Sequence, residues 1–209
     1  MEKFIIEGGN PLNGEITPSG NKNAALPILA ATLLTDEPII LHNLPNIRDV
    51  RDMCQLVASL GVKIEDLGNN SWKLTAKIVR PADLDPDLCA RIRASILLAV
   101  PLLARSCEVH LPPPGGDVIG RRRVDTHILA LKAMGADIHY RRSFDLKAKS
   151  LKGANIILDE ASVTATENVV MAAVTAKGTT VIRNAASEPH VQELCQMLNI
   201  LGADITGIG

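Results

Sequence analysis

A short phrase that occurs three times along the chain constrains the fold more than any other feature. Leu60–Ile64 reads Leu-Gly-Val-Lys-Ile, and closely similar phrases return at Met134–Ile138 and at Leu201–Ile205. Their glycines lie 74 (135 − 61) and 67 (202 − 135) residues apart. A period of this length is typical of supersecondary units that repeat along a chain and bury their apolar faces in one shared core.

Each copy of this phrase follows a stretch with the apolar spacing of an amphipathic helix. Counted back from the glycine, positions −1, −4, −8 and −11 are apolar in all three copies except at His127. This spacing predicts helices that end at a C-terminal glycine, over residues 50–60, 124–134 and 191–201. A short strand is expected after each helix, at 62–65, 136–140 and 203–206.

The part of each unit that precedes these helices also repeats. Residues 23–34, 93–104 and about 164–176 have the length of a helix and are apolar on nearly every side, which is typical of buried helices. Each of them leads into a β-rich stretch, at 38–41, 107–111 and 179–183. The sequence therefore predicts an α/β domain of three similar units, in which buried helices are wrapped by sheets and outer helices.

The repeat also decides how the cysteines and one histidine are interpreted. Cys54 and Cys195 each lie seven residues before their glycine, at core positions, so we predict packed thiols without a catalytic role. His127 lies on the apolar stripe of its helix, which favours a buried structural histidine over a ligand-binding one. The four cysteines have no metal-ligand or redox spacing, which indicates a reducing, cytoplasmic setting and no metal site.

Composition excludes several classes of partner. The formal net charge is −1 and the four aromatic residues are scattered, so neither a basic nor a base-stacking nucleic-acid surface is expected. The longest apolar run, about residues 94–104, is shorter than the roughly 18 residues of a membrane-spanning helix. The opening MEKFIIEGGN lacks the apolar stretch of a secretory signal. We therefore expect no nucleic-acid partner and no membrane.

The stretch Pro112–His127, which reads PPPGGDVIGRRRVDTH, carries the densest chemistry of the chain. Gly115 and Gly116 loosen a loop that prolines stiffen at its base, and Asp117 follows them directly. Arg121–Arg123 stand just before a helix start, where free backbone N–H groups also favour anions. This pattern predicts an anion site with a proton-donating acid beside it. A surface loop with a solvated run of charges is the alternative.

Aligning the three units places further polar residues at the same end of the buried helices. Arg93 falls opposite Asn23, because each lies 18 residues before the end of its β-rich stretch (111 − 93 and 41 − 23), and Ser162–Thr164 falls nearby. Lys22 and Arg122 add positive charge to the helix starts that gather there. We expect a site for a ligand with more than one anionic group, phosphate or carboxylate. Helix caps and solvated charges are the alternative interpretation.

At four places the residues match those of a known family. These places are Pro18–Pro27 (PSGNKNAALP), Arg93–Ser95, Pro114–Gly120 and Arg122–His127. Together they closely resemble the UDP-N-acetylglucosamine 1-carboxyvinyltransferases, a branch of the enolpyruvyl transferase family, and the match runs along the whole chain. The sister branch, the 3-phosphoshikimate 1-carboxyvinyltransferases, shares the fold but lacks the Gly-Asn-Lys-Asn-Ala-Ala signature and the Pro-Gly-Gly loop.

The resemblance implies a fold and a reaction. The fold is an inside-out α/β domain of three repeats, with helices in the middle and sheets outside. The reaction transfers the enolpyruvyl group of phosphoenolpyruvate to the 3′-hydroxyl of UDP-N-acetylglucosamine and releases phosphate, the first committed step of cytoplasmic peptidoglycan precursor synthesis. The resemblance implies no metal and no cofactor.

Site residues carry over by position from the family's motifs. Asp117, Lys22 and Arg122 are the catalytic candidates, with Asp117 as the general acid. Lys22 and Asn23 are expected at the phosphoenolpyruvate site, and Arg122 is expected to bridge both substrates. The positions expected to bind the nucleotide sugar are Arg93, Arg122, Arg123, Val124, Asp125, Thr126, Glu160, Ala161, Ser162 and Val163.

Three features depart from the family pattern. Most members have cysteine where this chain has Asp117, an aspartate being a recognised variant, and many have glycine where it has Thr164. Members also carry a second three-repeat domain, so residues 1–19 are expected to pair with that domain and residues 20–209 to form the transferase domain. A truncated, catalytically incompetent UDP-sugar-binding domain is therefore an alternative function. A polyanion binder that uses Arg121–Arg123 is a further one.

Overall fold

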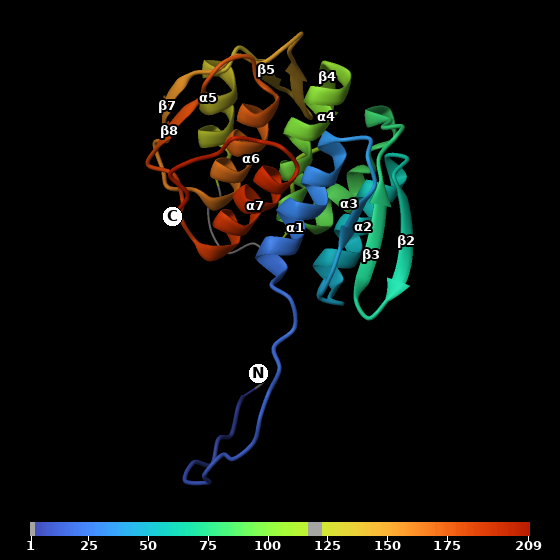
Figure 1. Ribbon diagram of the computed structural model, residues 1–209, viewed down its shortest axis with the longest axis vertical. Coiled ribbons are helices and arrows are strands. Elements are labelled where there is room, and N and C mark those ends of the chain that lie inside the picture. Colours follow the sequence, from blue (N-terminus) through green and yellow to red (C-terminus); the bar gives the residue numbers. More distant parts are fainter. Residues whose placement is uncertain (1–2, 117–122) are drawn as a thin grey trace.

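The computed structural model describes residues 3–116 and 123–209, and three helical segments run through the middle of its body (Figure 1). They are α1 (Lys22–Ala31) with the 3-10 turn η1 (Thr32–Leu34), the 3-10 helix η3 (Arg93–Leu98) with α4 (Ala99–Ser106), and α6 (Val163–Thr175). Their apolar side chains form one core, and Leu29, Leu102 and Val169 are fully buried in it. The three predicted buried helices are confirmed, because side chains that are apolar on every side leave no face for water.

Three outer helices follow the buried ones along the chain: α2 (Arg48–Ser59), α5 (Asp125–Ala133) and α7 (Pro189–Ile200). Each leads into the repeated phrase, whose glycines Gly61, Gly135 and Gly202 have φ angles of 99°, 94° and 104°. Glycine adopts this left-handed conformation without the strain that a Cβ atom causes. The predicted helices and their glycine ends are confirmed.

Two three-stranded antiparallel sheets accompany the first two pairs of helices. The first contains β1 (Ile39–Leu41), β2 (Lys63–Gly68) and β3 (Ser71–Thr75) in the order β1-β3-β2. The second contains β4 (Glu108–Leu111), β5 (Asp137–Tyr140) and β6 (Phe144–Lys147) in the order β4-β6-β5. The strands β1, β2, β4 and β5 confirm sequence predictions. The central strands β3 and β6 had not been predicted.

The third sheet differs from the other two. It consists of two parallel strands, β7 (Asn155–Ile157) and β8 (Val181–Arg183), which α6 connects. The strand predicted at 179–183 is confirmed as β8, whereas the strand predicted at 203–206 is wrong.

The failed strand has a physical reason in its hydrogen bonds. In the first two sheets the corresponding strand, β2 or β5, pairs with the strand that directly follows it. Residues 203–206 have no such pairing partner in the described part of the chain. The backbone of Ile205 is bound instead by the side chain of Asn199, which accepts from its N–H at 2.8 Å and donates to its carbonyl at 2.9 Å.

The remaining segments connect these layers or leave them. The short helices η2 (Pro81–Asp83) and α3 (Pro86–Arg91) join the first sheet to the second buried helix. Residues 3–19 precede α1 as an extended arm that is exposed along its whole length and leads away from the body (Figure 1). Within the two described ranges, no helix has both the length and the apolar character needed to cross a membrane.

Candidate active site

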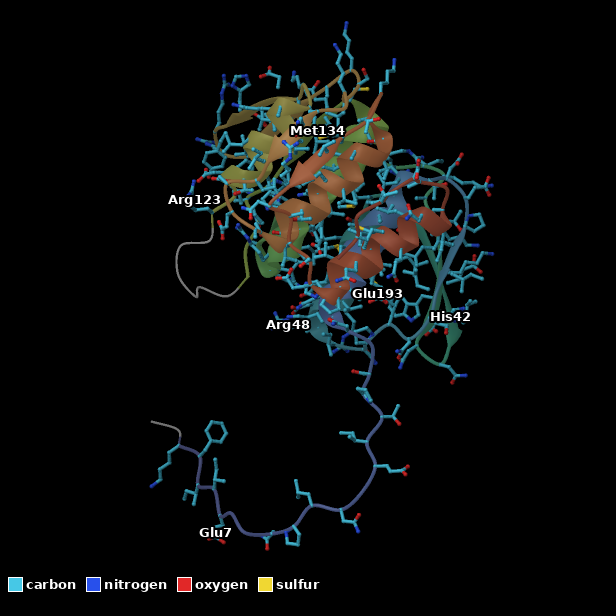
Figure 2. All side chains as sticks on the ribbon, turned by 60° about the vertical axis from the view of Figure 1, so that its left-hand side comes forward. Glu7, His42, Arg48, Arg123, Met134 and Glu193 are labelled. Atoms are coloured by element: carbon cyan, nitrogen blue, oxygen red, sulfur yellow. The ribbon has the colours of Figure 1, made fainter. Side chains whose placement is uncertain are left out.

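Arg93 begins η3, shortly after α3 ends at Arg91, and its side chain reaches the start of α5. The Arg93 guanidinium donates from Nη2 to the backbone carbonyl of Arg123 at 3.0 Å. Arg123 in turn donates from Nε to Asp125 Oδ2 at 2.7 Å, and its Nη2 lies 3.7 Å from Asp159 Oδ2. The bond to Asp125 raises the pKa of Arg123, which is exposed on the surface of the body (Figure 2). Arg93, Arg123 and Asp125 therefore form one charged cluster.

The segment 160–163 joins this cluster through Asp159, which lies two residues after the end of β7. Thr126 Oγ1 donates to Asp159 Oδ1 at 2.6 Å, and this bond ties the start of α5 to the turn before α6. In that turn the Ser162 N–H donates to the Glu160 carbonyl at 2.7 Å, and Ser162 caps α6 by accepting from Ala165 N–H at 3.4 Å. Sequence reasoning missed Asp159, although an acid directly after the apolar run 156–158 was a usable signal.

The base of the glycine loop lies on the C-terminal end of α3, close to Arg93. Gly115 N–H donates to the Cys89 carbonyl at 3.1 Å, and Gly116 N–H donates to the Ala90 carbonyl at 3.3 Å. A Cβ atom at Gly115 would lie 1.6 Å from the Ala90 carbonyl oxygen, so only glycine allows this approach. A Cβ at Gly116 would lie 3.0 Å from the Arg93 backbone nitrogen. Asp117, Arg121 and Arg122 lie outside the described residues, between Gly116 and Arg123.

Lys22 and Asn23 begin α1, where Asn21 caps the helix by accepting from Asn23 N–H at 2.8 Å. The Lys22 ammonium donates to Asp49 Oδ2 of α2 at 2.9 Å, and both side chains are partly exposed. Lys22 is therefore bound to α2 rather than to the cluster around Arg93. The expected meeting of Lys22 with Arg93 around one ligand stays a prediction.

A second acid of α2 connects these two regions. The Asp52 side chain, which is only 8% exposed, lies 3.7 Å from Arg48 Nε and 4.0 Å from Arg91 Nη1. Arg91 ends α3 and stands two residues before Arg93. Arg91 and Arg93 thus reach in different directions. Arg91 reaches Asp52 of α2, and Arg93 reaches the start of α5.

His127 is buried in the first turn of α5, at 3% exposure, and hydrogen-bonded at both ring nitrogens. Asn168 Nδ2 donates to Nδ1 at 2.8 Å, so Nε2 carries the proton and donates to Thr164 Oγ1 at 3.2 Å. Asn168 also donates to the Ile96 carbonyl at 3.1 Å. Burial, with the charge of Arg93 as the smaller cause, lowers the pKa of His127 from 6.5 to about 4. The predicted structural histidine is confirmed.

The low pKa of His127 predicts a loss of stability in acid. The unfolded chain takes up a proton at this residue below about pH 6.5, whereas the folded chain does so only near pH 4. The free energy of unfolding should therefore fall by about 3 kcal/mol as the pH falls from 6.5 to 4. Urea unfolding across this range should show the loss in the parent and in the exposed control His139→Gln, but not in His127→Gln. Equal acid slopes in the parent and His127→Gln would contradict this assignment.

The cysteines in the outer helices pack as predicted. Cys54 and Cys195 are buried, and burial raises the pKa of Cys54 to about 12. Neither thiol is therefore ready to act as a thiolate nucleophile at neutral pH. In the part of the chain that the structure describes, no three His, Cys, Asp or Glu side chains are grouped in a way that could hold a metal ion.

Curated relatives resemble this chain along its full length. It is 58% identical over 207 residues to a protein of Bradyrhizobium diazoefficiens and 57% identical over 209 residues to one of Treponema denticola, both named UDP-N-acetylglucosamine 1-carboxyvinyltransferase. The alignments cover 99% and 100% of this chain and 48% and 49% of the relatives. The chain therefore spans about half the length of the curated relatives it matches.

Solved structures share the fold at lower identity. The enolpyruvyl transferase NikO from Streptomyces tendae aligns with a TM-score of 0.81 at 24% identity, over 97% of this chain and 48% of its own. EPSP synthase from Acinetobacter baumannii aligns with a TM-score of 0.71 at 19% identity, over 93% of this chain and 45% of its own. These identities support the α/β fold alone.

The family assignment rests on the sequence as well as the fold. Residues 6–209 match the sequence family described as EPSP synthase (3-phosphoshikimate 1-carboxyvinyltransferase). This range covers all three buried helices, the glycine loop and the charged cluster around Arg93. The chain therefore belongs to the EPSP synthase family of enolpyruvyl transferases, and it resembles the members that are named UDP-N-acetylglucosamine 1-carboxyvinyltransferase.

Proposed function

We propose that this chain provides one wall of the active site of an enzyme that transfers the enolpyruvyl group of phosphoenolpyruvate to the 3′-hydroxyl of UDP-N-acetylglucosamine. The reaction releases phosphate and begins peptidoglycan precursor synthesis in the cytoplasm. The observation that carries the proposal is the 58% identity to a UDP-N-acetylglucosamine 1-carboxyvinyltransferase over 99% of the chain. The charged cluster at Arg93 supports it, because both substrates are anions.

The proposed chemistry is an addition followed by an elimination. Carbon 3 of phosphoenolpyruvate gains a proton while the sugar hydroxyl attacks carbon 2 and loses its own proton. The tetrahedral intermediate then loses a proton from carbon 3 as the bond from carbon 2 to the phosphate oxygen breaks, which releases phosphate and restores the double bond. Asp117 serves as the acid that supplies the first proton. Lys22 and Arg122 stabilise the charge that shifts onto the phosphate as it leaves, and Asn23 orients the same substrate.

The nucleotide sugar is assigned to the cluster built on Arg93. Arg93, Arg123 and Asp125 are joined by contacts of 3.0 and 2.7 Å, and Thr126 links them to the turn 160–163 through Asp159. Backbone N–H groups at the starts of α5 and α6 add donors for phosphate oxygens. This arrangement suits a ligand with a diphosphate and a sugar, whose anionic and polar groups need donors from several segments.

The proposal extends to the architecture and to a further domain. The buried helices α1, η3-α4 and α6, each followed by a strand and an outer helix, support a domain of three similar units with the helices inside. We assign the second wall of the cleft to the part of the relatives that this chain does not span. The same observation favours one alternative, a UDP-sugar-binding domain without turnover of its own.

Substitution of Arg93 tests the binding assignment. Arg93→Ala should weaken UDP-N-acetylglucosamine binding by about 1.5–3 kcal/mol, the scale of charge-assisted hydrogen bonds. Calorimetry is carried out on this chain extended to the full length of its relatives, with Arg142→Ala on the exposed turn between β5 and β6 as the control. Unchanged affinity in Arg93→Ala would remove Arg93 from the site. Absence of sugar-nucleotide binding by the full-length parent would overturn the proposed function itself.

A further inference from the structure

A threonine at the start of α6 makes a contact that the proposed function does not yet use. Thr164 is the second residue of α6, and it directly follows the segment 160–163 that is assigned to the nucleotide sugar. Its Oγ1 atom lies 3.2 Å from Nε2 of His127, in the first turn of α5. The two helices lie side by side in the body (Figure 1). The Thr164 hydroxyl is thus directed toward buried His127, and it joins the starts of α5 and α6.

The direction of this hydrogen bond is fixed by Asn168, one turn further along α6. Asn168 Nδ2 donates to the Ile96 carbonyl at 3.1 Å, and only the nitrogen of an asparagine amide can donate to a carbonyl oxygen. The same nitrogen lies 2.8 Å from Nδ1 of His127, which therefore accepts. Burial lowers the pKa of His127 to about 4, so the ring is neutral at neutral pH and carries one proton. That proton is on Nε2, and the Thr164 hydroxyl accepts the bond from it.

These bonds connect the three segments that carry the candidate site. Ile96 belongs to η3, which Arg93 begins, His127 belongs to α5, and Asn168 and Thr164 belong to α6. Asn168 and His127 are both buried. The network therefore links the three segments from inside the core, whereas the charged cluster around Arg93 lies at the surface.

The starts of α5 and α6 are held together at two points. The first is the bond of 2.6 Å from Thr126 to Asp159, and the second is the bond from His127 to Thr164. One hydrogen bond between two segments allows rotation about it, whereas two bonds also fix their relative orientation. The orientation matters because the free backbone N–H groups of both helix starts are assigned to one ligand.

We infer that Thr164 is a positioning residue of the proposed sugar-nucleotide site, because its hydroxyl accepts from His127 and so holds the start of α6 in a fixed orientation to the start of α5. The inference rests on the proposed function, since it assumes that both helix starts bind one anionic ligand. It also gives a role to a departure from the family pattern. The glycine that many members have at this position offers no side chain to accept the bond, so the threonine adds a contact inside the protein.

Removal of this acceptor should change binding more than chemistry. The Nε2–H group of His127 would lose its partner, and a buried donor that loses its partner shifts toward another acceptor or toward water. Either shift moves the first turn of α5, and with it the segment 123–126, relative to α6. The affinity for the sugar nucleotide should fall, while the steps assigned to Lys22 and Asp117 should keep their rate.

Steady-state kinetics of the full-length enzyme test the inference with two substitutions at this position. Thr164→Val keeps the branched shape and removes the acceptor, so the KM for UDP-N-acetylglucosamine should rise about 10-fold, the scale of one buried hydrogen bond, while kcat changes less than ~2-fold. Thr164→Ser keeps the hydroxyl and should behave as the parent does. Thr175→Val, at the other end of α6, is the matched control, because the Thr175 hydroxyl donates to the Ala172 carbonyl of the same helix.

The possible results are distinguishable. A parent-like KM in Thr164→Val would overturn the inference, and so would an equal rise in Thr164→Ser, which would assign the effect to shape rather than to the hydroxyl. A fall in kcat with an unchanged KM would also overturn it, because that pattern is expected when part of the enzyme is unfolded. Absence of UDP-N-acetylglucosamine binding by the full-length parent in calorimetry would overturn the proposed function, and the inference with it.

Discussion

Asp117→Asn in the full-length enzyme is expected to lose turnover by ~10²–10⁴-fold, the usual contribution of a general acid, while keeping its affinity for UDP-N-acetylglucosamine. The asparagine side chain has nearly the same size but carries no acidic proton. Gly115 and Gly116, which precede it in the sequence, contact the C-terminal end of α3 next to Arg93. Gly116, which precedes Asp117 in the sequence, therefore lies beside Arg93 of the proposed sugar-nucleotide cluster.

The role of Asp117 depends on binding, because a free aspartate has a pKa of about 3.9 and is ionised at neutral pH. Nearby arginines would lower that pKa further. A proton donor arises only if loop closure desolvates the carboxyl group, or if an anionic substrate neutralises the arginines. We therefore expect the acid to be assembled by phosphoenolpyruvate and UDP-N-acetylglucosamine together, in the filled cleft.

A cysteine at this position provides the matched comparison. A thiol has a pKa near 8.5 and begins protonated, and its thiolate is a better nucleophile than a carboxylate. Asp117→Cys should keep turnover and gain sensitivity to alkylating epoxides, which the parent should resist. Steady-state phosphate release and calorimetry are measured on the parent, Asp117→Asn and Asp117→Cys. The first measures the chemical reaction and the second measures substrate binding. Turnover of Asp117→Asn near that of the parent would remove Asp117 from the mechanism.

Glu167→Gln should stabilise the fold at neutral and alkaline pH. Glu167 is 1% exposed in α6, and its Oε1 atom has no hydrogen-bond partner within the described residues. Burial, with the charge of Glu188 as the smaller cause, raises the pKa of Glu167 from 4.5 to about 8. A carboxyl that is buried without a partner keeps its proton, because the charged form loses its hydration.

The sign of the pH dependence follows from which state holds the proton. Above about pH 4.5 the unfolded chain releases the proton of Glu167, whereas the folded chain retains it up to about pH 8. The free energy of unfolding should therefore fall by roughly 5 kcal/mol as the pH rises through this window, and Glu167→Gln should not show this loss.

Urea unfolding at pH values across this window measures the effect. Glu193→Gln, on the exposed face of α7, is the matched control and should follow the parent. The contribution of His127 to the free energy of unfolding falls as the pH falls, whereas that of Glu167 falls as the pH rises. The two contributions can therefore be separated in the same series. If the free energy of unfolding had the same pH dependence in the parent and in Glu167→Gln, the Glu167 carboxyl would be hydrated in solution and the assignment would be wrong.

Much of the fold could be read from local patterns. Gly61, Gly135 and Gly202 end their helices because a left-handed residue is needed there, and this requirement depends on the backbone alone. The buried helices were predictable because a helix that is apolar on every side can be stable only inside a core. The family motifs likewise depend only on the order of residues along the chain.

Tertiary structure decided which segments pair as strands, because local sequence patterns do not specify the partner. β3 and β6 are short, and each became a central strand only because two neighbours from other segments flank it. Residues 203–206 resemble two real strands and yet form none, because a strand exists only through its partner's hydrogen bonds.

The candidate site shows the same division. The sequence by itself determined that Lys22 and Arg93 begin helical segments, that Arg123 stands just before one, and that such positions favour anions. Which acid each cation meets was decided by packing between segments far apart in the chain: Asp49 binds Lys22, while Asp159 joins Arg123 and Thr126. The neutral state of His127 was decided in the same way, since its low pKa comes from burial and from the charge of Arg93, and neither exists before the chain folds.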